Sequence, residues 1–189
     1  MKISSSVDAG DVWFLSAKNG AERLGSLMFY MEPGTLKVSA KGTKLETPVY
    51  SGPAYAADLN SLNAVQKQPL FKKLEALYKE QNDTYQKDTA RFNAARKAVA
   101  DLDGDRTAVY EKWIAAHTAS PVSAYVLSMQ LRYEDMNQLE ASLKSLKPAA
   151  KNNLVAKKLQ HTVDASRATA IGKIAPSLRR TTPSVNRLP

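Results

Sequence analysis

The clearest hydrophobic pattern in the chain lies at residues 27–40, LMFYMEPGTLKVSA. It opens with an apolar run of strand length, and Pro33-Gly34 then supplies a turn, because Pro fixes φ and Gly tolerates positive φ. After the turn, apolar and polar residues alternate with a period of two, which places one face in a core and the other in water. The pattern predicts a strand, a tight turn and a second strand, with the apolar positions of the second at Leu36, Val38 and Ala40.

Two further strands are predicted on either side of this element. Residues 11–17, DVWFLSA, are bulky enough for a strand, and Asn19-Gly20 is a strong hairpin signal. Residues 45–51 suit a last short strand, with Pro48 placing it at a sheet edge. The β portion is therefore expected at residues 11–52 as a small antiparallel meander of about four strands, after a disordered leader at residues 1–10.

The pattern becomes helical at Ser51-Gly52-Pro53, where Ser51 can cap a helix and Pro53 suits the first turn. Apolar residues then recur at helical spacing and predict about five helices in residues 53–170. A sheet this small needs a cover for its apolar face, so the helices are expected to pack on it. The sequence thus predicts an α+β fold whose sheet edges invite pairing with another chain, such as a homodimer through strand exchange.

Local signals mark the boundaries of these helices. Pro69 should kink or restart the first helix, which then continues through Val99. The segment DLDGD breaks the pattern, and Asp105 is the expected N-cap of the helix that follows. Ser120 and Pro121 repeat the cap-plus-proline start for a short buried helix.

The chain is strongly basic, with 27 Lys and Arg against 18 Asp and Glu and a net charge of +9. Such a balance suits nucleic acid, an anionic surface or an acidic partner. The basic residues are spread over the helices and the C-terminal residues, so a solvated surface is favoured over a nucleic-acid footprint. There is no apolar run near 18 residues, so we expect no transmembrane helix.

The residue types that carry catalysis are sparse, and we expect no enzyme activity, no metal site and no cofactor. Cysteine is absent, which excludes disulfides and thiol chemistry within this chain. The segment DLDGDRTAVYE fails as a calcium loop, since Arg106 and Lys112 stand where an EF-hand needs Gly and Glu. Neither His117 nor His161 has a second ligand at helical spacing, so packed or surface positions are favoured for both.

Aromatic residues at the junction of sheet and helices are the candidate partner contacts. These are Tyr30, Tyr50 and Tyr55, and core or rim packing is the competing interpretation for the last two. The basic last helix, with Lys151, Lys157, Lys158 and Arg167, can touch phosphates, although a solvated helix face is favoured.

Three stretches in order resemble a known family. They are FYMEPGTLKVS within residues 28–39, followed by VYSGP at 49–53; IAAHTASPVSAY at 114–125; and IGKIAP at 171–176. This order resembles the N-terminal domain of unknown function that precedes the thioredoxin-like domain in TlpA-like and AhpC-TSA-type thiol:disulfide oxidoreductases of Gram-negative bacteria. The resemblance covers about residues 11–176. The earlier strands and the signal sequence of the family are missing before residue 11, and no Cys-x-x-Cys follows residue 176.

The resemblance implies a periplasmic or cell-envelope location and a non-catalytic accessory role. In that role the domain would recognise a substrate protein, dimerise, or position the missing thioredoxin domain. Residues 171–189 would form a linker and disordered tail, with its hinge at Gly172 and Pro176. The alternative function is a basic helical module that binds nucleic acid or an anionic surface, which salt would weaken steeply.

Overall fold

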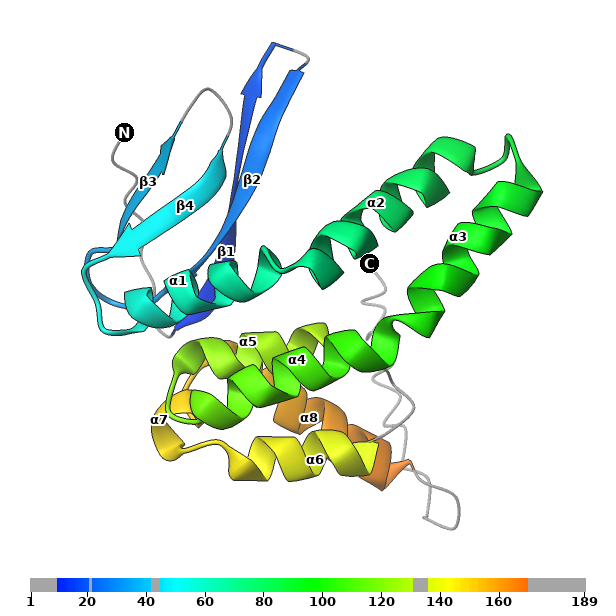
Figure 1. The fold of residues 1–189 in the computed structure, drawn as a ribbon. Helices are drawn as coiled ribbons and strands as arrows, with labels where there is room; N and C mark the ends of the chain where they lie inside the picture. Colours follow the sequence, from blue (N-terminus) through cyan, green and yellow to red (C-terminus); the bar gives the residue numbers. More distant parts are fainter. Residues whose placement is uncertain (1–9, 21, 42–44, 131–135, 170–189) are drawn as a thin grey trace, which may run out of the picture.

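A computed structural model describes residues 10–20, 22–41, 45–130 and 136–169. Two β-hairpins stand on a layer of helices (Figure 1), so the α+β fold class is confirmed. The strands are β1 (Asp11–Asn19), β2 (Glu22–Met31), β3 (Lys37–Lys41) and β4 (Glu46–Ser51). The predicted leader at 1–9, the linker hinge at Gly172 and Pro176 and the tail to residue 189 lie outside the described residues.

The strands form two separate two-stranded antiparallel sheets, so the predicted four-stranded meander is wrong. The register of β1 and β2 pairs Val12 with Tyr30 and Phe14 with Met28. In the other hairpin Val38 of β3 lies opposite Tyr50 of β4. Each strand thus pairs with the strand that is next to it in the chain, β1 with β2 and β3 with β4.

The Pro33-Gly34 segment joins the two hairpins rather than closing one. Gly34 has a φ of 145°, well beyond the value near 80° that a type II turn needs at this position. The tight turn predicted here is therefore absent, and β2 and β3 separate. Tyr50 reaches across between the hairpins, and its hydroxyl donates a hydrogen bond to the Met28 carbonyl oxygen.

The helical part has more elements than the roughly five helices predicted. They are α1 (Tyr55–Gln66), α2 (Pro69–Thr84), α3 (Thr89–Asp101), α4 (Asp103–Ala116), α5 (Pro121–Met129), α6 (Met136–Ser145), α7 (Pro148–Lys151) and α8 (Leu154–Ala168). The excess has three sources: the predicted first helix restarts at Pro69, it breaks again between Thr84 and Thr89, and a one-turn helix precedes α8. At the break Gln86 adopts a positive φ of 59°, and the Asp88 carboxylate then caps α3 by accepting the Arg91 N–H.

Proline and serine signals located some helix starts correctly. Pro69 occupies the first turn of α2, and Ser120 caps α5 by accepting the Val122 N–H. Two predicted caps are wrong. Ser51 is still part of β4, and Asp105 lies inside the first turn of α4, which begins at Asp103 without a side-chain cap.

One hydrophobic core joins both hairpins to the helical layer. Tyr30 and Tyr50 contribute from the strands, and the helices contribute most of the remaining residues. The fully buried members include Leu59, Leu62, Val122, Val126 and Val163. Gly10, the last residue of the predicted leader, is buried beside this core, and its carbonyl oxygen accepts the Leu154 N–H at 2.9 Å. The leader prediction is therefore wrong at this residue.

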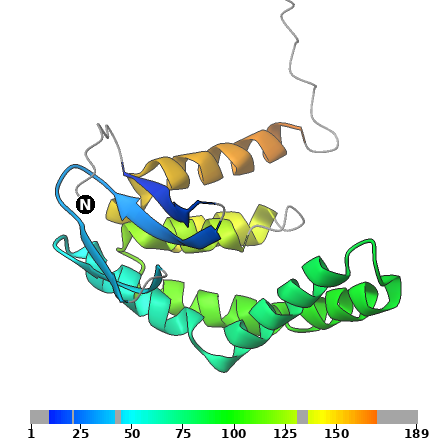
Figure 2. The ribbon, with the colours of Figure 1, turned by 90° about the horizontal axis from the view of Figure 1, so that it is seen from above.

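Helices α2 and α3 form an antiparallel pair that extends away from the hairpins (Figure 2). At its base Phe71 packs on Tyr110 of α4, with ring centroids 5.2 Å apart. Beyond that point the two helices contact chiefly each other (Figure 1). At the base of the first hairpin α8 contacts the start of β1, where Leu154 bonds to Gly10 and Lys158 pairs with Asp11. Helix α1 packs against β4 of the second hairpin.

Candidate protein-binding surface

The first hairpin, β1 with β2, exposes aromatic side chains on both of its faces, and we call it the open ribbon. Phe14 is 64% exposed and lies beside Met28, whereas Trp13 is 41% exposed and lies opposite Phe29. Because neighbouring strand residues point to opposite faces, the two aromatic rings cannot share one core. Two packed helices would be needed to cover them, and the fold supplies helices at the base of the ribbon only (Figure 1).

The base of the open ribbon is held firmly by Tyr30. This side chain is 2% exposed and makes an edge-to-face contact with Tyr55 at 4.9 Å. Its hydroxyl lies against the Cα of Gly10, where an added Cβ would come within 1.7 Å of the hydroxyl oxygen. Gly10 is in turn bonded to the start of α8, so the ribbon begins from a fixed point.

The structure places Tyr30, Tyr50 and Tyr55, the predicted partner contacts, in the core. The three residues do gather where the strands meet α1, but each is buried in the core. Burial raises the pKa of all three hydroxyls above the ordinary tyrosine value, and the nearby Glu32 carboxylate raises those of Tyr30 and Tyr55 further. Their role is packing, which was the competing interpretation for Tyr50 and Tyr55.

Sequence reasoning did not select Trp13 and Phe14 as surface residues. The available signal was their adjacency in DVWFLSA, since two bulky neighbours on a strand must face opposite ways. A strand with a packed layer on each face would bury both side chains. Whether Trp13 and Phe14 are exposed therefore depends on which elements cover the two faces of the strand. That information is absent from the local pattern.

Polar side chains of α1 close the outer edge of the second hairpin. The Asn60 amide bonds both backbone groups of Tyr50, and Asn63 donates to the Pro48 carbonyl oxygen at 3.2 Å. The edge that the Pro48 signal placed on β4 is therefore occupied by helix side chains. The Tyr50 hydroxyl similarly satisfies the Met28 carbonyl oxygen of β2.

Basic residues flank the start of β1. Lys158 on α8 lies 3.5 Å from the Asp11 carboxylate, and its own side chain remains 71% exposed. Lys157 and His161 of the same helix are also exposed, as is Lys18 near the far end of β1. Of the four basic residues predicted on the last helix, Arg167 is used elsewhere, since it forms an ion pair with the buried Glu140 of α6.

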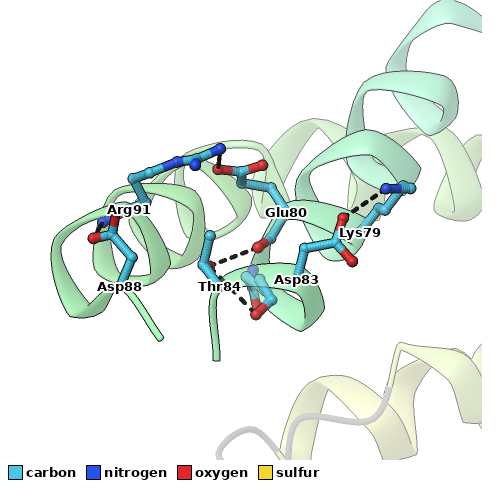
Figure 3. A network of polar contacts seen from close by, with 7 residues as sticks. Lys79, Glu80, Asp83, Thr84, Asp88 and Arg91 are labelled. Carbon is cyan, nitrogen blue, oxygen red and sulfur yellow. Dashed lines mark hydrogen bonds and ion pairs between the residues drawn. The ribbon is translucent and has the colours of Figure 1, made fainter. Parts of the chain in front are cut away.

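The tip of the α2–α3 pair carries the most extensive polar network, shown in Figure 3. Glu80 pairs with Arg91 across the two helices, Lys79 pairs with Asp83, and the Thr84 hydroxyl donates to the Glu80 carbonyl oxygen at 2.6 Å. An open depression of about 280 Å³ lies beside it, lined by Leu77, Glu80, Arg91, Ala94 and Ala95. The Glu80–Arg91 ion pair joins α2 to α3, whereas the Lys79–Asp83 pair lies within α2.

The histidine and the aspartate-rich segment have structural positions. His117 stacks on Trp113 at 4.1 Å, and its Nδ1 lies 2.8 Å from the Trp113 carbonyl oxygen, to which it can donate. The DLDGD segment continues from α3 into α4 with a break only at Leu102, so it forms no calcium loop. In the described ranges, no three His, Asp or Glu side chains gather as metal ligands would.

Comparisons with known proteins gave no match: no family model, no curated protein and no solved structure is similar to the chain at a significant level. In the part of the chain that the structure describes, no helix is both long and apolar enough to span a membrane.

Proposed function

We propose that the chain is a non-catalytic protein-binding domain that contacts its partner through the open ribbon. The observation that carries this proposal is the exposure of Trp13 and Phe14 on opposite faces of one strand. Exposed aromatic residues on an unpaired strand edge mark interaction sites, because burying them is favourable and the edge offers unpaired backbone groups.

The treatment of the other strand edges supports this assignment. The fold closes β4 with two asparagine side chains and caps a β2 carbonyl group with a tyrosine hydroxyl. Among the described residues, the cover for β1 is confined to its first two residues, where Lys158 pairs with Asp11 and the Asp11 carboxylate accepts the Val12 N–H at 2.8 Å. A binding partner for β1 would explain why its edge is left open while those of β4 and β2 are bonded to side chains.

An accessory role in a thiol:disulfide oxidoreductase, in the periplasm or cell envelope, is the more specific form of the proposal. It rests on the resemblance of the three sequence stretches described above. One of these, with Ser120 and Pro121, forms the start of α5 and packs in the core. In this role the open ribbon would contact the substrate protein, a second copy of the chain or the thioredoxin domain.

The proposal can be tested by photo-cross-linking in cells that produce the protein. A benzophenone amino acid replaces Phe14 in one variant and Tyr85, which is 58% exposed at the tip of α2, in a matched control. The proposal predicts discrete protein adducts from position 14, identified by mass spectrometry, and few from position 85. Equal adducts from both positions, or none from position 14, would contradict it.

A further inference from the structure

The open edge of β1 is the longest strand edge that the structure leaves available. β1 has nine residues and pairs with β2 alone among the described strands. At its start the Asp11 carboxylate accepts the Val12 N–H at 2.8 Å, and among the described residues no side chain bonds to the backbone from Trp13 to Asn19. The β3 strand is shorter, with five residues, and β2 accepts the Tyr50 hydroxyl at Met28. A peptide in extended conformation can add to such an edge, where backbone hydrogen bonds give affinity and alternating side chains give specificity.

Helix α8 contacts the base of this edge, at the start of β1. Its first residue bonds to Gly10 directly before β1, and Lys158 reaches Asp11 one residue later. Figure 2 shows α8 on the β1 side of the ribbon, away from β2. The buried side of α8 carries Ala156, Leu159 and Val163, so the exposed Lys157, Lys158 and His161 remain available to a neighbouring strand.

The charges around this edge are predominantly positive. Asp11 is already matched by Lys158, whereas Lys18 and Lys157 have no carboxylate within 4 Å among the described residues. A second copy of the chain would bring the same excess of positive charge, as each copy has a net charge of +9. A strand with carboxylate side chains would bring the opposite charge, which favours encounter and orientation.

We infer that the open edge of β1 binds an extended acidic segment of a partner protein as a third strand. This inference rests on the proposed function and specifies its partner class. Backbone groups of β1 pair with the segment, Trp13 and Phe14 contact its side chains on the two faces, and the exposed Lys18 and Lys157 attract its carboxylates.

The test uses a capped nine-residue peptide in which glutamate alternates with valine and threonine, matching β1 in length. Trp13 reports binding by fluorescence, and Trp113, buried in the core, supplies a constant background. We expect saturable binding that is at least ~10-fold tighter than that of the same peptide with lysine in place of glutamate. The difference should shrink when the salt concentration is raised to about 0.5 M, because salt screens exposed charges.

Four controls connect the signal to the site. The Trp13→Phe variant should lose the fluorescence change while still binding, as measured by calorimetry. Phe14→Ser should weaken binding at least ~5-fold, because Phe14 contributes an exposed aromatic contact, and Tyr85→Ser should leave it unchanged. A peptide with proline at every second position should not bind, since proline cannot donate backbone hydrogen bonds.

The outcomes separate this inference from the proposed function. Equal binding of the glutamate and lysine peptides, or no binding of either, overturns the acidic-strand inference. If cross-linking at position 14 still captures discrete proteins, the proposed function survives that result. Capture of a second copy of the chain at position 14, with concentration-dependent dimerisation that Phe14→Ser abolishes, would also overturn the inference, because the occupant would then be a β1 strand itself.

Discussion

Asn60 of α1 bonds both backbone groups of Tyr50 on β4. Its Oδ1 accepts the Tyr50 N–H at 2.9 Å, and its Nδ2 donates to the Tyr50 carbonyl oxygen at 2.8 Å. A single side-chain amide thus takes the place of a neighbouring strand at this position. It also joins the second hairpin to the helical layer, since β4 has no strand on that side in the described part of the chain.

Replacing Asn60 with Ala should lower the free energy of unfolding by about 1–3 kcal/mol, because it leaves two backbone groups without partners. Urea unfolding followed by circular dichroism measures this change. Asn63→Ala removes one longer bond at 3.2 Å and should cost about 1 kcal/mol or less. Equal effects of the two substitutions would show that the two Asn60 hydrogen bonds contribute no more to the free energy of unfolding than the single Asn63 bond.

Gly10→Ala should destabilise the fold by about 1–3 kcal/mol, since the added methyl group overlaps the Tyr30 ring. The matched control is Gly104→Ala in the first turn of α4, where an added Cβ meets nothing within 4 Å. This control should be neutral or stabilise by up to about 1 kcal/mol, because Ala favours a helix over Gly. Thermal unfolding of both variants distinguishes them, and a stable Gly10→Ala protein would mean that Gly10 does not pack on Tyr30.

Asn153 should be among the most sensitive polar residues in the chain. Its buried side chain accepts the Ala156 N–H at 2.8 Å as the cap of α8 and donates to the Ala150 carbonyl oxygen at 2.7 Å. Asn153→Ala should cost about 2–4 kcal/mol through the lost cap and the orphaned carbonyl group. The exposed neighbour serves as control: Asn152→Ala should change the unfolding free energy by less than about 0.5 kcal/mol.

Glu140 should make the stability depend on pH. The hydrogen bond from Lys144 is the main cause that lowers the pKa of this carboxyl, and the Arg167 charge lowers it further. A lowered pKa in the folded state means that the stabilisation is present above the unfolded-state pKa, near 4.3 for Glu. It is lost as the pH falls through the folded-state pKa.

The matched variant for this prediction is Glu140→Gln. Wild type should be the more stable protein at neutral pH, and the difference should shrink as the pH falls through the lowered folded-state pKa of Glu140 and the carboxyl becomes protonated. Urea unfolding at a series of pH values measures both proteins. A difference that stays constant across this range would show that the charge of Glu140 does not contribute.

The features that local sequence predicted correctly are those that neighbouring residues determine. Asn19-Gly20 marked the turn of the first hairpin, Pro69 marked the start of α2, and Ser120-Pro121 marked the start of α5. Each of these positions depends on a backbone preference or a cap within a few residues. The division into strands first and helices afterwards follows from the change in hydrophobic period near Ser51.

The features that local sequence did not predict depend on distant residues. The separation of β2 from β3 involves Tyr50, which reaches the β2 carbonyl group from 22 residues away. The break between α2 and α3 carries no Gly or Pro, and only the Asp88 cap marks it locally. The candidate site also depends on distant residues. The three tyrosines were selected because they lie at the junction of sheet and helices in the sequence, and in the structure the core buries them at that junction.

The central claim is that the outer edge of β1 is open and receives a strand. Site-resolved amide hydrogen exchange tests it most directly, because in a two-stranded ribbon only every second amide of β1 is bonded to β2. We expect the outward amides of residues 13–18 to exchange rapidly in the free protein and to become protected when the glutamate peptide is added. The Val12 amide is left out because it already donates to the Asp11 carboxylate. Protection of every β1 amide in the free protein at low concentration, or no change with saturating peptide, would contradict it.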